Sequence, residues 1–346
     1  MLRRLMDILR CPSCKEGLRL KVHEQRTIKS AERVFPGCVE FCEHCSFVLD
    51  SSNRSYAHAH CGECYTQDVL KGNLTCSLGH QFPILSSVPR LNPERVEQKR
   101  TKKTFDVEWS AFEYGERIYG HSQEEEIEDF FRRMTVDGSF LEGKTVLDAG
   151  CGVGRLSQSV ARYAREVVGM DFSEGTGDAR ARNRALANVH IVQGDIMQPP
   201  FRQGAFGYVY CKGVLHYVPD VKASLRSLAS LVESEGFLSV TINPQRPPAF
   251  ETFNKGLRKV TLGLPVGIVY LLSHALVPFL NLAWVWSGLK RRPIAWNERA
   301  HMIFNWLSSD HLNTSSDLQM SQWLVDLGFD SLRISEVPVG ITGRKS

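Results

Sequence analysis

The feature that most limits how this chain can fold is a glycine-rich loop directly after a short apolar segment. Residues 144–149 (KTVLDA) have the apolar character of a buried strand, and Gly150, Gly152 and Gly154 come next. Glycines at such a position let backbone amides approach a ligand, and the positive end of the following helix points at it. A helical pattern over residues 155–164 completes a strand, loop and helix unit.

Six more segments have the composition of strands, and helical or turn-forming residues separate most of them. They are residues 166–171, 189–195, 206–211, 236–242, 331–337 and 339–343. Acids at the start and arginines at the end predict a helix over residues 124–134, and residues 316–327 predict the last helix. Strands that alternate with helices form a parallel sheet. We therefore expect an α/β fold with a doubly wound, seven-stranded, Rossmann-like sheet.

Three carboxylates mark the ends of the first three strands, namely Asp148, Asp171 and Asp195. A dinucleotide fingerprint would need glycine where the chain has Arg155, and Asp148 would repel a pyrophosphate. A ligand with an ammonium and a sulfonium suits Asp148, while Asp171 can accept hydrogen bonds from both ribose hydroxyls. The acids therefore predict a cationic nucleoside cofactor.

The runs VLDAGCGVGR, VVGMDFS, VQGDIMQPPF and FGYVYCKGVLHYVPD, in this order, closely resemble the motifs of class I, S-adenosylmethionine-dependent methyltransferases. The resemblance covers roughly residues 104–346. The runs TFDVEWSAF and VPVGITGRK also resemble bacterial methyltransferases that act on small molecules. In such an enzyme Phe105 and Trp109 would belong to a segment that closes over the cofactor.

The resemblance also implies a role for each motif residue. Asp148, Gly150, Gly152 and Gly154 would line the methionine part of the cofactor, and Asp171 would hold its ribose. Phe172 would lie against the adenine, Asp195 and Ile196 would meet the adenine edge, and Cys211 to Gly213 would pass beneath the methyl-bearing sulfur.

Methyl transfer to a hydroxyl or an amine needs an aligned acceptor and a base. His216 follows the fourth strand and is the best-placed candidate for a catalytic residue; a packing role is the alternative. Tyr217, His301, Asp310 and His311 are weaker candidates.

The ten cysteines are concentrated at one end of the chain, because eight of them precede residue 80. The first residues lack the apolar stretch of a signal peptide, so we expect a cytoplasmic protein in which cysteines bind metal rather than form disulfides. The half-sites Cys11-x2-Cys14, Cys42-x2-Cys45, Cys61-x2-Cys64 and Cys76-x3-His80 supply eight ligands, enough for two closed, structural zinc sites.

The pairing of these half-sites is open. Consecutive half-sites can pair, or the outer two can close around an inserted inner finger. We favour the second arrangement because LRCPSCKEGLRL and CSLGHQFPILSSVPRL resemble the zinc ribbon beside several methyltransferases. These include guanine methyltransferases of large ribosomal RNA. Cys38 is left over, and His44, His58 and His60 are expected to be neighbours rather than ligands.

A long excursion separates the fifth strand from the last helix. We expect residues 244–313 to form a helical lid over the ligand crevice rather than extra packing. Residues 264–286 carry no Asp, Glu, Lys or Arg, yet Pro278 and the polar residues within this stretch argue against a membrane span. Two short helices with a corner at Pro278 are expected, which contact a membrane surface at most.

The sequence thus predicts a zinc-binding module over residues 1–92, a linker and cap over 93–123, and a methyltransferase domain over 124–346. The expected acceptor is a small, apolar or lipid-linked metabolite. The alternative is methylation of an RNA base, with the zinc module used for RNA recognition and phosphate contacts from the basic runs 99–103 and 290–292.

Overall fold

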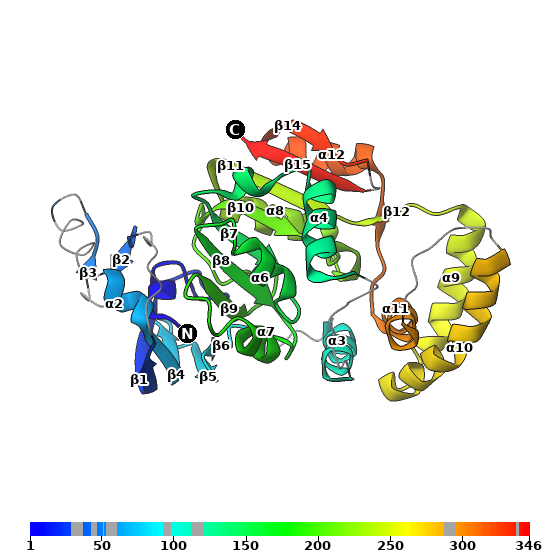
Figure 1. Ribbon diagram of the computed structural model, residues 1–346, viewed down its shortest axis with the longest axis horizontal. Helices are drawn as coiled ribbons and strands as arrows, with labels where there is room; N and C mark the ends of the chain where they lie inside the picture. The colour runs from blue at the N-terminus through cyan, green and yellow to red at the C-terminus, as the bar shows by residue number, and fades with distance from the viewer. Residues whose placement is uncertain are drawn as a thin grey trace.

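A seven-stranded sheet lies at the centre of the chain (Figure 1). The computed structural model describes residues 1–28, 37–42, 47–50, 52, 61–92, 98–111, 121–286, 295–336 and 339–346. The strands of the central sheet are β7 (Thr145–Ala149), β8 (Glu166–Asp171), β9 (Val189–Gln193), β10 (Phe206–Cys211), β11 (Val232–Thr241), β14 (Phe329–Ile334) and β15 (Gly340–Lys345). Their order is β14-β15-β11-β10-β7-β8-β9, with β15 antiparallel to both of its neighbours and the other pairs parallel.

Helices connect these strands as the alternating pattern predicts. They are α4 (Gln123–Met134), α5 (Gly138–Leu141), α6 (Arg155–Val160), α7 (Thr176–Arg182), the 3-10 turn η3 (Leu215–Tyr217), α8 (Val221–Leu231) and α12 (Asp317–Asp326). The start of α4 is fixed by a capping box, in which Ser122 accepts from the amide of Glu125 and the Glu125 side chain accepts from the amide of Ser122. Strand β10 follows β7 in the sheet, so the carboxyl ends of β7, β8 and β10 meet at one edge.

The cysteine-rich N-terminal module has its own antiparallel sheet. Its strands are β1 (Leu18–Thr27), β4 (Gln67–Cys76), β5 (Gln81–Leu85) and β6 (Val88–Pro89), and it also holds the turn η1 (Arg3–Asp7), the hairpin of β2 (Phe41–Cys42) and β3 (Phe47–Val48), and helix α2 (Cys61–Thr66).

This N-terminal module shares a hydrophobic core with the central sheet. Leu5, Leu9 and Leu74 belong to the same buried cluster as Val168 of β8 and Val192 of β9. Backbone hydrogen bonds join the two parts as well, because the amide of residue 10 donates to the carbonyl of residue 200 and the amide of residue 202 donates to that of residue 8. The module is therefore part of one packed unit with the sheet.

The segment between β11 and α12 is mainly helical, and its two ends lie side by side. It consists of β12 (Asn243–Pro244), α9 (Pro248–Thr261), α10 (Val266–Trp286), α11 (Trp296–Ser308) and β13 (Thr314–Ser315), and β12 pairs with β13 in parallel. A separate hydrophobic cluster that includes Val269, Val277 and Phe304 holds α10 against α11. We call α9, α10 and α11 the lid; Figure 1 shows α9 and α10 at the end of the molecule farthest from the N-terminal module.

The expectation of two short helices with a corner at Pro278 is wrong, because α10 runs from Val266 to Trp286 with Pro278 inside it. Residue 278 lies on the exposed side of the helix, where water can satisfy the carbonyl that proline leaves without a donor. Among the described residues, none of the helices combines the length and the apolar character that a bilayer crossing requires.

Helix α3 (Lys99–Ala111) ties the lid to the rest of the molecule. The guanidinium of Arg100 donates hydrogen bonds to the carbonyls of Thr261, Leu264 and Ser308. Asp310 accepts from the amide and the hydroxyl of Thr101. These bonds hold the junction between α9 and α10, and the segment at the end of α11, against one helix.

Candidate functional site

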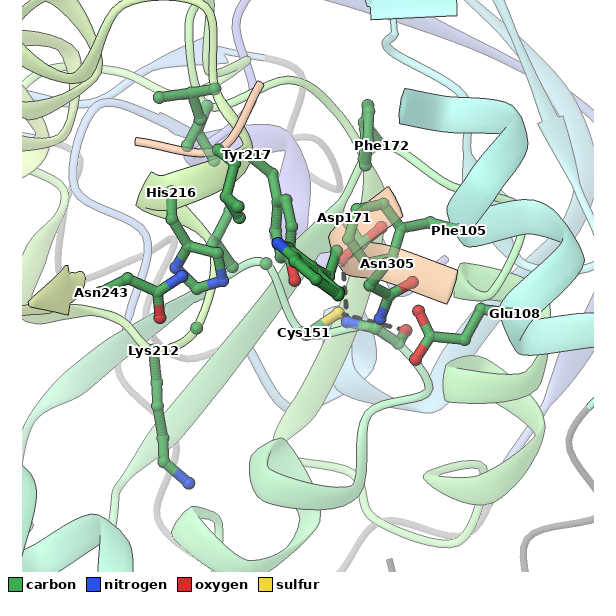
Figure 2. A pocket seen from close by; sticks show the side chains of 18 of the residues that line it. Phe105, Glu108, Cys151, Asp171, Phe172, Lys212, His216, Tyr217, Asn243 and Asn305 are labelled. Carbon is green, nitrogen blue, oxygen red and sulfur yellow. Dashed lines mark hydrogen bonds between the residues drawn. The ribbon is translucent and has the colours of Figure 1, made fainter. Parts of the chain in front are cut away.

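A cavity of about 710 Å³ lies between the carboxyl edge of the sheet and the lid. One wall comes from the glycine loop and the ends of β7, β8 and β10, and the other comes from α3, α9 and α11. In the view of Figure 2, His216 and Asn243 lie on one side of the cavity, Glu108 and Asn305 lie on the other, and Asp171 lies between them. The cavity is therefore enclosed by segments that are far apart in the sequence.

Glycines are required in the glycine loop because neighbouring side chains pack closely against its backbone. Gly150 and Gly152 have φ angles of +95° and +52°, in the region that L side chains rarely adopt. A Cβ on Gly150 would lie 2.2 Å from Val214 Cγ2, and a Cβ on Gly152 would lie 2.7 Å from the ring of Trp109. The ring of Trp109 in α3 thus packs directly on the loop.

Asp171 links the glycine loop to the end of β8. Its Oδ2 accepts a hydrogen bond from the amide of Gly152 at 2.9 Å, and its Oδ1 accepts from the amide and the hydroxyl of Ser173 at 2.9 and 2.6 Å. Burial raises the pKa of Asp171, although these hydrogen bonds oppose the rise. A carboxylate oxygen has two acceptor positions, so Oδ2 keeps one for a ligand hydroxyl.

Asp148 is the second buried acid of this wall. Its Oδ2 accepts from the hydroxyl of Ser157 at 2.6 Å, and its side chain is almost entirely removed from solvent. Burial raises the pKa of Asp148 to about 6. A cation beside this carboxyl group would favour its ionised form.

Most of the predicted cofactor residues line the cavity. They are Asp148, Gly150, Gly152, Asp171, Phe172, Asp195 and Ile196. Gly154 and Cys211 lie outside the lining. A Cβ on Gly154 would meet Ala179 Cβ at 2.8 Å, so this glycine serves the packing of α6 on α7, and the side chain of Cys211 lies in the hydrophobic core.

His216 also lines the cavity, and 8% of it is exposed. Burial lowers its pKa to about 4, so the imidazole is neutral at pH 7. Within the described part of the chain, its Nδ1 has no hydrogen-bond partner. Tyr217 lines the cavity beside it, with ring centroids 4.1 Å apart.

The weaker catalytic candidates other than Tyr217 do not line the cavity. His301 lies inside the lid, where its ring contacts Tyr270 and His274. Asp310 binds Thr101 as described above, and His311 is not part of the lining.

The polar residues that helices contribute to the cavity were not predicted from the sequence. Glu108 of α3 is fully buried there, and Asn305 of α11 is 6% exposed, with no partner for its Oδ1 within the described residues. Glu251 and Asn254 of α9 line the same space. The position of Glu108 between Phe105 and Trp109 was the signal available, because residues three or four apart share a helix face.

The charge of the cavity wall is mainly negative. Its acidic residues are Glu108, Glu126, Asp148, Asp171, Asp195 and Glu251, and its basic residues are Arg155, Lys212 and Arg246. Arg155 pairs with Glu126 at 2.8 Å, and Lys212 pairs with Asp129 at 3.5 Å. The buried acids, the glycine loop and the ring of Trp109 therefore fit a cationic nucleoside such as S-adenosylmethionine.

A second cluster of chemically active side chains lies in the N-terminal module. Cys11, Cys14, Cys76 and His80 place one potential ligand atom each within 4.8 Å of all the others. His80 Nδ1 is 3.2 Å from the Sγ of Cys76 and 3.6 Å from that of Cys11. Three sulfurs and one imidazole at such distances suit a tetrahedral zinc ion, and the grouping joins the two outer half-sites.

The inner cysteines lie only partly within the described residues. Cys42 and Cys64 are buried, while Cys45 and the side chain of Cys61 fall outside the described part, as do His44, His58 and His60. Cys38, which belongs to none of the predicted half-sites, is buried beside Cys42. A hydrogen bond with Cys64 raises the pKa of the Cys38 thiol. Asp7 accepts from the amides of residues 39, 40 and 41 and so holds the turn after Cys38.

The strand order, the glycine loop and the acid-lined cavity are similar to those of class I, S-adenosylmethionine-dependent methyltransferases. Residues 147–240 match the methyltransferase domain family. This range includes the glycine loop and all of β8, β9 and β10.

The chain is also similar in sequence to two named methyltransferases. A demethylmenaquinone methyltransferase of Geobacillus kaustophilus is 33% identical over 36% of this chain and 53% of its own length. A ubiquinone biosynthesis O-methyltransferase of Sodalis glossinidius is 30% identical over 42% of this chain and 59% of its own length. The chain thus spans little more than half the length of these relatives. Among solved structures, magnesium protoporphyrin IX methyltransferase of Synechocystis PCC 6803 with bound S-adenosylmethionine aligns with a TM-score of 0.44 and 18% identity, over 74% of this chain and 100% of that one.

Proposed function

We propose that the chain transfers the methyl group of S-adenosylmethionine to a hydroxyl or amine group on a small, largely apolar or lipid-linked acceptor. One observation carries this proposal: the cavity joins the acid-lined glycine loop to a wall formed by the lid. Cofactor and acceptor would therefore lie in one enclosed space, as an in-line displacement requires.

The cofactor supplies an electrophilic methyl group on a sulfonium. Asp171 would hold the ribose and Asp148 would face the positive charge, while the glycine loop leaves room for the ligand's backbone contacts. Trp109 and Phe105 of α3 would exclude water from the site.

Two buried polar atoms of the cavity wall favour a ligand that donates hydrogen bonds. His216 Nδ1 and Asn305 Oδ1 are buried acceptors with no partner within the described residues. The surrounding wall is apolar, with Val218, Ile303 and Leu312 among its members. A hydroxylated ring or an amine on an apolar frame meets both requirements. One relative is named a ubiquinone biosynthesis O-methyltransferase, which supports an oxygen atom as the acceptor.

His216 is the proposed base. When a hydroxyl oxygen forms the new bond to the methyl carbon, the carbon–sulfur bond breaks and the hydroxyl proton must leave. Because the pKa of His216 lies well below 7, its imidazole is unprotonated at neutral pH and has a ring nitrogen free to accept that proton.

We propose that the N-terminal module binds zinc in a structural role. Cys11, Cys14, Cys76 and His80 would form one closed site, and the inner cysteines would form a second. A closed site stabilises the fold and leaves no ligand position for chemistry.

The RNA alternative has no support among the relatives named above. In the basic run 99–103, Arg100 binds three lid carbonyls and Lys102 pairs with Asp106 and Glu174. These two side chains are engaged within the protein, which argues against phosphate contacts from them. The run 290–292 lies outside the described residues.

The proposal is tested by incubating the full chain with S-adenosylmethionine that carries a labelled methyl group and a panel of acceptors. The panel contains catechols with and without a prenyl tail, aliphatic amines and an RNA transcript. We expect label in the prenylated catechol, and His216→Gln should lower kcat by about 10²-fold or more without changing cofactor affinity. His23→Gln, an exposed residue of β1, is the matched control. Label in the RNA, or in no small acceptor despite cofactor binding, would overturn the proposal.

A further inference from the structure

The lid exposes large apolar side chains to an unusual degree. Among the described residues, half of the exposed large hydrophobic side chains lie between residues 253 and 302. The most exposed of them are Phe253 and Val260 of α9 and Leu271 and Phe279 of α10, at 62%, 66%, 68% and 71%. Single exposed hydrophobic residues need no explanation, but their concentration on α9 and α10 does.

Helix α10 is apolar on both of its sides. Ile268, Leu271, Leu272 and Phe279 recur at the spacing of one helix face and are exposed, while the opposite face packs on α11. A helix that is apolar all round is found in a protein core or in contact with lipid. The outer face of α10 has no protein partner within the described residues.

The charge of this region is of one sign. From residue 252 to residue 297 the sequence has six basic residues and no acidic residue; the basic ones are Lys255, Arg258, Lys259, Lys290, Arg291 and Arg292. Of these, Lys255 and Lys259 are exposed on α9 with Phe253 and Val260. Apolar side chains between basic residues are typical of helices that lie in the headgroup region of an anionic membrane.

Helix α9 separates the cavity from this surface by the thickness of one helix. Its residues Glu251 and Asn254 line the cavity, whereas Phe253, Lys255 and Val260 point to solvent. An apolar acceptor held in a bilayer would therefore lie close to the cavity if the outer surface of the lid rested on that bilayer.

We infer that the outer surface of the lid, formed by Phe253, Lys255, Lys259, Val260, Ile268, Leu271, Leu272 and Phe279, docks on an anionic lipid surface without crossing it. A second copy of this chain is a poorer occupant, because a twofold contact would bring the same uncompensated lysines together. The inference goes beyond the proposed reaction and does not depend on which acceptor is methylated.

Vesicle flotation of the full chain tests the inference. Vesicles contain phosphatidylcholine alone or phosphatidylcholine with about 30% phosphatidylglycerol, and no acceptor is needed. We expect binding to the anionic vesicles that weakens with salt, because one basic residue near such a surface contributes about a fivefold factor. Lys255→Glu/Lys259→Glu and Leu271→Glu/Phe279→Glu should each weaken binding more than tenfold.

The control is Leu318→Glu, which changes an 81% exposed leucine of α12 outside the lid. It should float like the parent protein, and all variants should keep their affinity for S-adenosylmethionine, which shows that they are folded. Failure of the parent protein to float, or equal loss in Leu318→Glu, overturns the inference. The inference is also overturned if the parent protein forms a dimer but does not bind vesicles, and the dimer dissociates in Leu271→Glu/Phe279→Glu. Vesicle binding with no methyl transfer would uphold the docking surface and contradict only the proposed function.

Discussion

Arg4 of the N-terminal module and Glu166, the first residue of β8, form an ion pair with 3.5 Å between Nη2 and Oε2. The two side chains are 4% and 0% exposed. Glu166 also accepts a hydrogen bond from the Tyr65 hydroxyl at 2.9 Å and lies 2.8 Å from Nε2 of His190. Burial would raise the pKa of Glu166, but Arg4 and His190 outweigh it and lower the pKa to about 2. Ionised groups thus connect the module to the sheet inside the protein.

Replacement of Glu166 by Gln should lower the free energy of unfolding by about 3–5 kcal/mol, because it leaves the buried charge of Arg4 without its counterion. Chemical denaturation measures the change. The matched control is Glu24→Gln, which breaks the exposed pair of Glu24 with Lys71 and should cost no more than about 1 kcal/mol. The contribution of Glu166 is present above its ordinary pKa of 4.5 and disappears as the pH falls toward 2, so the difference between parent and variant should shrink in that range. Equal effects of the two variants would contradict the role of the buried pair.

Asp171→Ala should weaken binding of S-adenosylmethionine by about 1.5–3 kcal/mol, the range for hydrogen bonds to charged groups. Calorimetry of the full chain gives the affinity, and the thermal midpoint shows whether the fold survives the loss of the bonds from Gly152 and Ser173. Asp178→Ala changes an exposed acid of α7 and should leave the affinity unchanged. Unchanged affinity in a folded Asp171→Ala protein would remove the cofactor assignment.

Affinity for S-adenosylmethionine should fall as the pH drops below about 6. The pKa of Asp148 is raised to about 6, so its carboxyl group becomes protonated below this pH and loses its attraction for a cation. Below the pKa we expect up to a tenfold weaker affinity per pH unit, and Asp148→Asn should abolish this dependence. Calorimetry at pH 5 and pH 8 compares the two proteins. The same pH dependence in parent and variant would show that another group is responsible.

The purified chain should contain two equivalents of zinc. Cys76→Ser should remove one equivalent and Cys64→Ser the other, whereas Cys151→Ser, at the glycine loop, should keep both. Elemental analysis measures the content. A single equivalent in the parent protein, or iron with a visible chromophore, would contradict the two-site proposal.

The strands and the cofactor edge could be predicted because their signals are local. The predicted bounds of β8 agree with the observed ones. The glycine loop lies directly beside Asp171, because the amide of Gly152 donates a hydrogen bond to its side chain. Gly154 could not be separated from the other two glycines, because its contact with Ala179 involves a helix later in the sequence. Cys211 illustrates the same limit, since the side a strand residue faces depends on the packed layers.

The walls formed by distant helices could not be predicted from the sequence. The predicted lid includes the apolar segment 264–286, but α10 contributes no residue to the cavity lining. Helices α9 and α11 provide this wall instead. The spacing of Glu251, Asn254 and Asn305 along the sequence gives no sign of a shared site. Their convergence depends on how α9 and α11 pack, which is a tertiary property.

The core that Leu5, Leu9 and Leu74 share with Val168 and Val192 has a consequence for protein synthesis. Residues 1–92 leave the ribosome before β8 and β9 have been made. At about 5–20 residues per second, their apolar faces wait roughly 5–20 seconds for the strands that cover them. During this interval the nascent module presents the kind of surface that chaperones bind, and a translational pause before residue 193 would prolong that exposure.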